Sequence, residues 1–223
     1  MSLNIKKIEM VKGPALKQEN VEAGTYPGRV AQIIDLGVQN QRPFNGEAKP
    51  PAHSLYITYE LVDEFCLDEN GEEDEDKPRW LSEKFPLFSM SADLAKSTKR
   101  YKALDPKDDH DGAFDELGGV ACNVLVVENE GKGKNKDKVY NNIQGIATMR
   151  PKDAKKCAEL KKDPVIFLLD DPDIEVFNNL PNWLQGDIKD NLGFSGSLLE
   201  QRLNGVEESP AEEDDDDDWG EDE

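Results

Sequence analysis

Residues 54–65 alternate apolar and polar side chains, and this alternation constrains the fold more than any other feature of the sequence. A period of two predicts a β-strand that is buried on one face. The face rich in aliphatic side chains is expected to point into a core and consists of Leu55, Ile57, Tyr59 and Leu61. The opposite face consists of Tyr56, Thr58 and Glu60.

Four further segments have the composition of β-strands. They are rich in β-branched and aliphatic residues, and they span residues 24–38, 79–88, 120–128 and 138–149. After the third strand, Ser91 is placed to cap a helix that continues to Leu104, with Asp93 early and basic residues late, as the helix dipole favours. The element order is therefore three strands, a helix and two strands.

This order is that of the OB-fold. We predict a mainly β protein, in which residues 1–150 form a five-stranded OB-fold Greek-key barrel with a helix between strands 3 and 4. Residues 151–206 are expected to form a helical C-terminal extension that packs on the barrel. Within it, residues 151–162 have a basic helical pattern, residues 165–169 are an apolar run, and residues 175–180 and 198–203 suit short helices. Residues 207–223 form an acidic tail that is expected to be disordered.

The charge of the chain is concentrated in two short segments. The net charge is −21, from 27 Lys and Arg against 48 Asp and Glu. Residues 207–223 hold twelve acids and residues 63–76 hold nine, with no base in either segment. Outside them 27 acids balance 27 bases. The net charge therefore does not exclude nucleic acid as a ligand.

The sequence argues against several other classes of protein. No segment approaches the roughly 18 consecutive apolar residues of a membrane span, and residues 1–13 lack the apolar region of a signal peptide. Cys66, Cys122 and Cys157 are odd in number and widely spaced, which disfavours a disulfide framework or a zinc site. His53 and His110 lie in polar segments without a recognisable catalytic motif. We expect a non-enzymatic cytoplasmic protein with no cofactor and no metal.

Two of the predicted loops, residues 39–53 and 129–137, are basic, and OB-folds bind oligonucleotides with the corresponding loops and with the central strands. Single-stranded nucleic acid requires a positive groove and exposed aromatic rings, on which each stacked base contributes about 1–3 kcal/mol. The predicted DNA-binding residues combine both properties and are Arg29, Arg42, Phe44, Lys49, Tyr56, Trp80, Lys84, Arg100, Lys132, Lys134, Lys136, Lys138 and Tyr140.

These assignments have structural alternatives. Strand aromatics such as Tyr56 and Trp80 also suit a core. The lysines of residues 132–138 also suit a solvated hairpin loop, and Arg100 a solvated helix face that complements the helix dipole. Phe44 is the strongest candidate for stacking, because its proline-rich loop offers little to bury it.

The tail combines a run of acids with one aromatic residue, and the run consists of Asp214, Asp215, Asp216, Asp217 and Asp218 before Trp219. A purely solvating tail needs no tryptophan, whereas a short peptide that docks in a basic pocket with an apolar floor does. With the strand order, the basic loops and the stretches GTYPGRVAQIIDLG, SLYITYELVDE, KFPLFSMS, VYNNIQGIATM and NLPNWLQGDIKDNLGFSGS, the chain resembles the single-stranded DNA-binding proteins of tailed bacteriophages.

The resemblance implies sequence-independent binding of single-stranded DNA during phage replication, repair or recombination, in the cytoplasm of the host bacterium. It also implies that the tail recruits a phage DNA polymerase, primase-helicase or recombinase, and it is compatible with a homo-oligomer. Many relatives end in an aromatic residue, whereas Gly-Glu-Asp-Glu follows Trp219 here.

Two other classes of function make different demands on the sequence. An acidic DNA mimic that binds a basic partner needs acids on a folded surface, whereas most acids here lie in the tail and one predicted hairpin tip. A nuclease needs convergent acids or histidines, and the sequence has no such recognisable pattern.

A polyanion tethered beside a basic groove competes with DNA phosphates at high effective concentration. We therefore expect deletion of residues 207–223 to tighten binding to oligo-dT at low salt, by a factor that shrinks as salt rises. Fluorescence anisotropy titrations of full-length and truncated protein over a salt series measure this factor. Unchanged or weaker affinity after truncation would rule out the competition.

Overall fold

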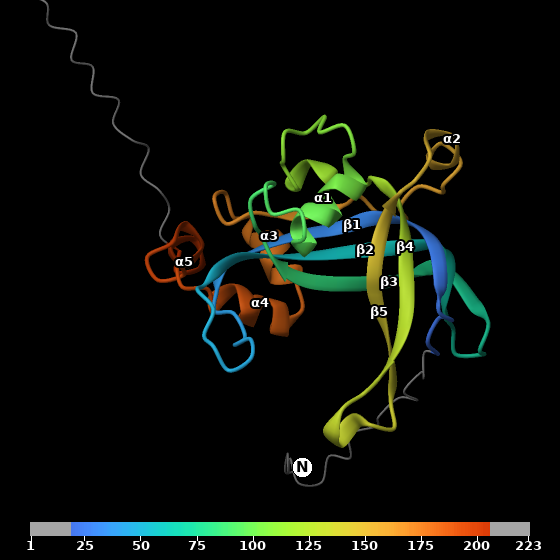
Figure 1. Cartoon of the computed structure of the whole chain (residues 1–223), viewed down its shortest axis with the longest axis horizontal. Helices are drawn as coiled ribbons and strands as arrows, with labels where there is room; N and C mark the ends of the chain where they lie inside the picture. The colour runs from blue at the N-terminus through green and yellow to red at the C-terminus, as the bar shows by residue number, and fades with distance from the viewer. Residues whose placement is uncertain (1–18, 206–223) are drawn as a thin grey trace, which may run out of the picture.

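Figure 1 shows the computed structural model, which describes residues 19–205, as a twisted sheet with helices around it. The strands are β1 (Gly24–Gln39), β2 (Ala52–Leu67), β3 (Glu73–Pro86), β4 (Ala121–Glu130), β5 (Val139–Thr148) and β6 (Val165–Phe167). The α-helices are α1 (Lys96–Leu104), α2 (Pro151–Ala154), α3 (Ile174–Asn179), α4 (Asn182–Lys189) and α5 (Leu198–Leu203). Short 3-10 helices span Asp115–Leu117 and Gly133–Asn135.

The five longest strands lie in the order β3-β2-β1-β4-β5, and each is antiparallel to its neighbours. Strands β1 to β4 thus have the neighbour order of a Greek key. This arrangement confirms a mainly β protein with a helix between β3 and β4. The sheet is not closed, because no ladder joins β3 to β5 within residues 19–205. The described residues therefore form an open sheet and not the closed barrel that was predicted.

Strand β1 changes its partner along one edge. Residues 24–29 pair with β4, whereas residues 32–34 pair in parallel with β6. Because β2 occupies the other edge of β1, β6 takes the position that β4 leaves. The apolar run of residues 165–169 is not among the predicted strands, so this sixth strand is an addition. A three-residue strand carries too little pattern to be recognised without its partner.

The first core fills the inner side of β1 to β5. The four β2 side chains predicted to point inward are all buried there, which confirms the alternation predicted for residues 54–65. The neighbouring strands contribute Val30 and Ile33 from β1 and Cys122 and Val124 from β4. Tyr101 and Leu104 of α1 complete the cluster.

The second core lies on the opposite side of β1, under the C-terminal helices. Ile34 and Leu36 of β1 pack against Phe167 of β6 and against buried side chains of α3, α4 and α5. Asp173 caps α3 by accepting hydrogen bonds from two backbone amides of its first turn, and Ser197 caps α5. The predicted short helices of the extension are thus confirmed, and they are packed on the sheet.

A buried ion pair joins α1 to both open edges of the sheet. Arg100 donates from Nε and Nη2 to the two carboxylate oxygens of Glu83 on β3, at 2.6 and 3.0 Å. Tyr59 and Lys96 donate to the same carboxylate, and Arg100 also reaches the carbonyl of Gln144 on β5 at 3.4 Å. Burial lowers the pKa of Arg100, but the hydrogen bonds and charge of Glu83 outweigh it and raise the pKa overall. Helix α1 therefore holds β3 and β5 in place where they do not pair.

Two predicted boundaries differ from the structure. Helix α1 begins at Lys96 and not after Ser91, because the hydroxyls of Ser97 and Thr98 bond to the backbone of the preceding segment. The acidic segment 63–76 is a long hairpin tip, as expected, but β2 and β3 extend well into it. Only residues 68–72 form its turn, with Gly71 at a φ of +83°.

Gly37 lies at a φ of +67° where β1 meets the C-terminal extension. A Cβ there would lie 2.8 Å from Cγ of Asn191 and 2.8 Å from Cδ1 of Leu169. We expect Gly37→Ala to lower the free energy of unfolding by about 2–4 kcal/mol, from left-handed strain and displaced neighbours. Urea unfolding measures the loss.

Gly46 provides the matched control, because its φ is +82° but no atom lies within 4 Å of the position of its missing Cβ. Gly46→Ala should cost only about 1–2 kcal/mol, from strain alone. Equal losses in the two variants would contradict a tight contact between Gly37 and the extension.

Candidate nucleic-acid interface

Six side chains of β2 and β3 form an ordered surface on the side of the sheet away from the first core. The register places Tyr56 opposite Lys84, Thr58 opposite Ser82, and Glu60 opposite Trp80. Paired residues share one face of a sheet, and we call these six residues the outer face. Trp80 is 44% exposed and its Nε1 donates to Oε2 of Glu60 at 2.9 Å. The indole is therefore fixed by its polar edge while part of its ring meets solvent.

Helix α4 adds a second exposed tryptophan to this surface. Trp183 is 55% exposed and packs edge-to-face on Tyr56, with ring centroids 5.4 Å apart. One helical turn later, Asp187 pairs with Lys84 at 3.0 Å. Residues four apart share a helix face, so one face of α4 contacts the outer face through both residues. Trp183 is absent from the DNA-binding residues predicted from the sequence, so its exposure on this surface is an addition.

The loop between β1 and β2 presents Phe44 at a tight turn. Phe44 and Glu47 exchange two backbone hydrogen bonds, at 2.9 and 3.0 Å, around Asn45 and Gly46. Both turn residues have positive φ, as in the two-residue hairpin turns that Asn-Gly favours. Phe44 is 62% exposed, and Nζ of Lys49 lies 4.9 Å from its ring centroid. The Asn-Gly pair is the sequence signal for this turn, which the prediction of a loop over residues 39–53 does not include.

The other basic loop lies at the tip of the β4–β5 hairpin. Residues 127–142, which we call the arm, extend beyond the last residue of β4 that pairs with β1. All four predicted lysines, Lys132, Lys134, Lys136 and Lys138, are exposed there, and Tyr140 is half-exposed on the arm. Asn141 braces the base of the arm by exchanging two hydrogen bonds with the backbone of Val21.

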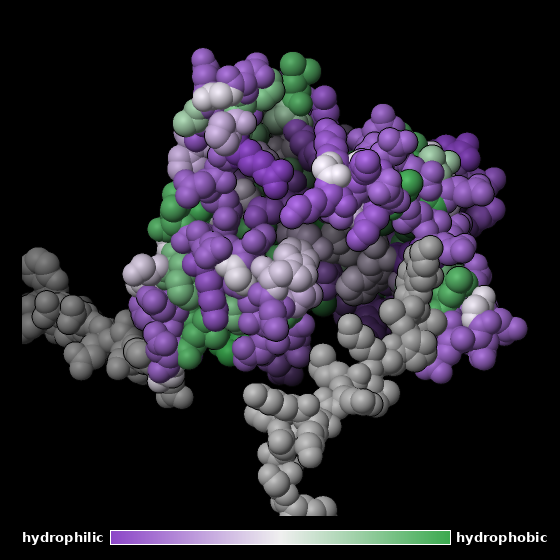
Figure 2. Space-filling model, turned by 90° about the horizontal axis from the view of Figure 1, so that it is seen from below, coloured by the Kyte–Doolittle hydropathy of each residue, from purple (hydrophilic) through white to green (hydrophobic). Residues whose placement is uncertain are grey.

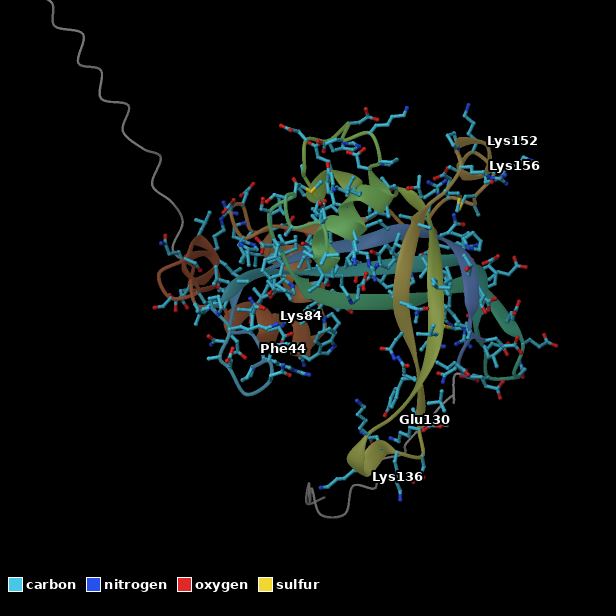
Figure 3. The ribbon with its side chains drawn as sticks, viewed as in Figure 1. Phe44, Lys84, Glu130, Lys136, Lys152 and Lys156 are labelled. Carbon is cyan, nitrogen blue, oxygen red and sulfur yellow. The ribbon has the colours of Figure 1, made fainter. Side chains whose placement is uncertain are left out.

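Figure 3 shows Phe44 and Lys84 on the side of the molecule where α4 lies, and Lys136 at the far end of the arm. The face seen from below, toward which the 40–51 loop, α4 and the arm project, is mostly hydrophilic (Figure 2). It carries scattered hydrophobic areas and is hollowed near its centre. Phe44, Lys84 and Lys136 therefore lie on the α4 side of the molecule or on the arm. Arg42 is also exposed in the 40–51 loop.

Two predicted DNA-binding arginines have their guanidinium groups inside the protein. Arg100 is only 5% exposed and pairs with Glu83, so the solvated helix face considered for it is wrong. Arg29 donates to the carbonyl oxygens of Gly119, Cys157 and Ala158, at 2.8, 3.0 and 2.7 Å. Both arginines stabilise the fold, and neither presents a free guanidinium to a ligand.

The prediction of a basic helix over residues 151–162 is wrong beyond the first turn, which is α2. Arg29 explains why the helix ends there. The carbonyls of Cys157 and Ala158, which a continuing helix would use internally, accept hydrogen bonds from Arg29 instead. We call residues 150–162 the strap, because this segment is tied across the outer side of β1.

Within residues 19–205, no three His, Cys, Asp or Glu side chains are grouped to hold a metal ion. Burial raises the pKa of the Cys122 thiol to about 12. His110 pairs with Glu116 at the surface. In the same range no helix has the length and apolar character needed to cross a membrane.

Comparisons with protein-family models, with curated proteins and with solved structures find no match to this chain. The predicted tail residues, Asp214 to Trp219, lie outside the described residues.

Among the described residues, the candidate interface consists of the outer face, Trp183, the 40–51 loop and the arm.

The pair between His53 and Asp35, at the base of the 40–51 loop, makes part of the stability depend on pH. Nε2 of His53 lies 2.5 Å from Oδ1 of Asp35, and this hydrogen bond raises the pKa of His53 although partial burial opposes it. The stabilisation is complete below the unfolded pKa of about 6.5 and is lost as pH rises through the folded value.

We therefore expect the urea midpoint of the wild type to fall as pH rises above about 6.5, and to fall less in His53→Gln. The hydrogen bond with Glu116 also raises the pKa of His110. His110→Gln is therefore measured in parallel, to separate the contribution of His110 to the pH dependence from that of His53. Equal pH slopes in the wild type and His53→Gln would contradict a contribution from the pair.

Proposed function

We propose that this protein binds single-stranded DNA without sequence preference and has no enzymatic activity. The observation that carries the proposal is the outer face with its neighbours, where the partly exposed rings of Trp80, Trp183 and Phe44 lie near Lys84 and Lys49. Trp80 and Trp183 offer ring surface for bases. Lys84 is paired with Asp187, but both side chains are partly exposed, so a phosphate can compete with this carboxylate for the ammonium group. Stacking and phosphate contacts use groups that all nucleotides share, so they give affinity without sequence readout.

We further propose that the sheet is an OB-fold with an open wall. The neighbour order, the helix between β3 and β4 and the Greek-key arrangement support this assignment. In such a fold the loop after β1 and the loop between β4 and β5 bind oligonucleotides. These two loops carry Phe44 with Lys49 and the lysines of the arm.

The distribution of acids favours DNA binding over the alternative of an acidic DNA mimic. Nine acids lie in residues 63–76, at the turn between β2 and β3. The 40–51 loop lies at the other end of β2 (Figure 1), and a strand of 16 residues spans about 50 Å at roughly 3.3 Å per residue. A mimic needs its acids spread over a binding surface, whereas these acids project from one hairpin end.

The acidic tail has a regulatory role in this proposal. Residues 207–223 would occupy the basic surface of the free protein and be displaced by DNA toward replication partners. The partners proposed from the phage resemblance are a DNA polymerase, a primase-helicase or a recombinase. The setting is phage DNA replication, repair or recombination in the host cytoplasm.

Removing single aromatic rings tests the interface. Trp80→Ala, Trp183→Ala and Phe44→Ala are each expected to weaken binding to oligo-dT by about 1–3 kcal/mol, or roughly five- to 150-fold in Kd. Lys134→Ala should lower the slope of log K against log salt by about 0.7, with little loss of stacking. Anisotropy titrations at several salt concentrations measure both effects.

Leu94→Ala is the control for loss of apolar surface, because Leu94 is highly exposed in the segment before α1 and lies off the outer face. It should leave the affinity unchanged. Circular dichroism shows whether each variant is folded. If all three folded aromatic variants bind as tightly as the wild type, the proposed interface is wrong.

A further inference from the structure

The strap, residues 150–162, is a strongly basic segment that lies outside the candidate interface. It holds six bases and two acids in 13 residues. The bases are Arg150, Lys152, Lys155, Lys156, Lys161 and Lys162, and all six are exposed. This density of charge is unusual in a chain whose net charge is −21.

The strap is fixed beside Trp80 by a single carboxylate. Oε2 of Glu60 accepts from the indole Nε1 of Trp80 at 2.9 Å, and Oε1 accepts from the backbone N–H of Lys161 at 3.1 Å. Arg29 holds the strap at two further points, the carbonyls of Cys157 and Ala158. The end of the strap is therefore positioned at the edge of the outer face before any ligand arrives.

Most of the strap lysines form no ion pair with other described residues of the protein. Arg150 pairs with Asp153 at 2.6 Å, and Nζ of Lys161 lies 5.7 Å from the ring centroid of Phe65. Among residues 19–205, the other four lysines have no ion-pair partner. Figure 3 shows Lys152 and Lys156 together at α2 and the turn after it, at the upper right of the view, while Phe44 and Lys84 lie left of and below its centre.

We propose that the strap binds the phosphate backbone of the single strand that lies on the outer face, so that the track runs from Phe44 past Lys84 and Trp80 to Lys152. The inference rests on the proposed function and extends its site to a second element. Compact ammonium groups on flexible stems bind phosphates as point charges and need no base contact. A strand that leaves Trp80 would meet the strap first, because Glu60 joins the two.

Single-stranded DNA is favoured over an acidic peptide because of what lies beside the strap. An acidic peptide with an aromatic residue needs an apolar pocket next to the bases. A pocket beside Lys156 is lined by Pro27, Val62 and Met149, but Asp63 and Asp153 line it as well, and these two carboxylates repel an acidic peptide. Trp80, which shares the Glu60 carboxylate with the backbone of Lys161, offers a partly exposed ring that suits stacking. Binding of an acidic peptide is therefore treated as an outcome that would overturn the proposal.

The test compares two double variants with the same change of charge. Lys152→Gln/Lys156→Gln alters the strap, and Lys99→Gln/Lys107→Gln alters two exposed lysines on and after α1. The probes are fluorescent oligo-dT of about 6 and about 16 nucleotides, lengths that span the site sizes known for single OB-folds. The strap variant should lose several-fold in affinity for the longer probe and less for the shorter one. Its salt slope for the longer probe should fall by about 1.4, or 0.7 for each lost phosphate contact.

Equal affinities and salt slopes in the two double variants would overturn the proposal. It would also be overturned if the strap variant lost binding to a peptide of residues 207–223 while keeping full affinity for the longer probe. Failure of the proposed function itself has a different signature. In that case the wild type does not bind either probe, or the folded Trp80→Ala variant binds the shorter probe as well as the wild type.

Discussion

The buried pair between Glu83 and Arg100 determines which side of β3 meets solvent. Side chains alternate along a strand, so an inward Glu83 requires Ser82 and Lys84 to point outward. A shift of β3 by one residue would bury Trp80 and Lys84 and leave the Arg100 guanidinium without its counter-charge. Breaking such a buried pair costs about 3–5 kcal/mol. The outer face therefore depends on a contact on the opposite side of the sheet, where α1 closes the gap between β3 and β5.

The C-terminal extension is part of the same surface and not an appendage to it. Strand β6 takes the edge of β1 that β4 leaves, and this pairing fixes where the chain enters α3 and α4. Helix α4 then places Trp183 on Tyr56 and Asp187 on Lys84. The strap is held by Arg29 and Glu60, which are neighbours across β1 and β2. In the proposed arrangement, the bases and rings of the outer face and the strap bind one strand of DNA, while nine acids lie in the β2–β3 hairpin.

The sequence predicted the elements whose pattern is local and missed those that depend on distant partners. The alternation of residues 54–65, the five long strands and the helix before Leu104 follow from periodicity, and the strands hold in the structure. Arg29 and Arg100 look like solvent-exposed bases in the sequence, because nothing local indicates that Cys157 or Glu83 will meet them. The exposure of Trp183 was missed for the same reason, since an aromatic residue in an amphipathic helix normally faces a core. The Phe44 turn is different, because Asn45-Gly46 was a local signal and was overlooked.

Photo-crosslinking to oligo-dT, followed by mass spectrometry of the peptides, tests most directly whether the outer face is the surface that holds single-stranded DNA. The account predicts crosslinks at Trp80 and Trp183, with Phe44 as a third site, and their loss when unlabelled oligo-dT competes. Crosslinks confined to other parts of the chain, with none on β3, α4 or the 40–51 loop, would contradict it.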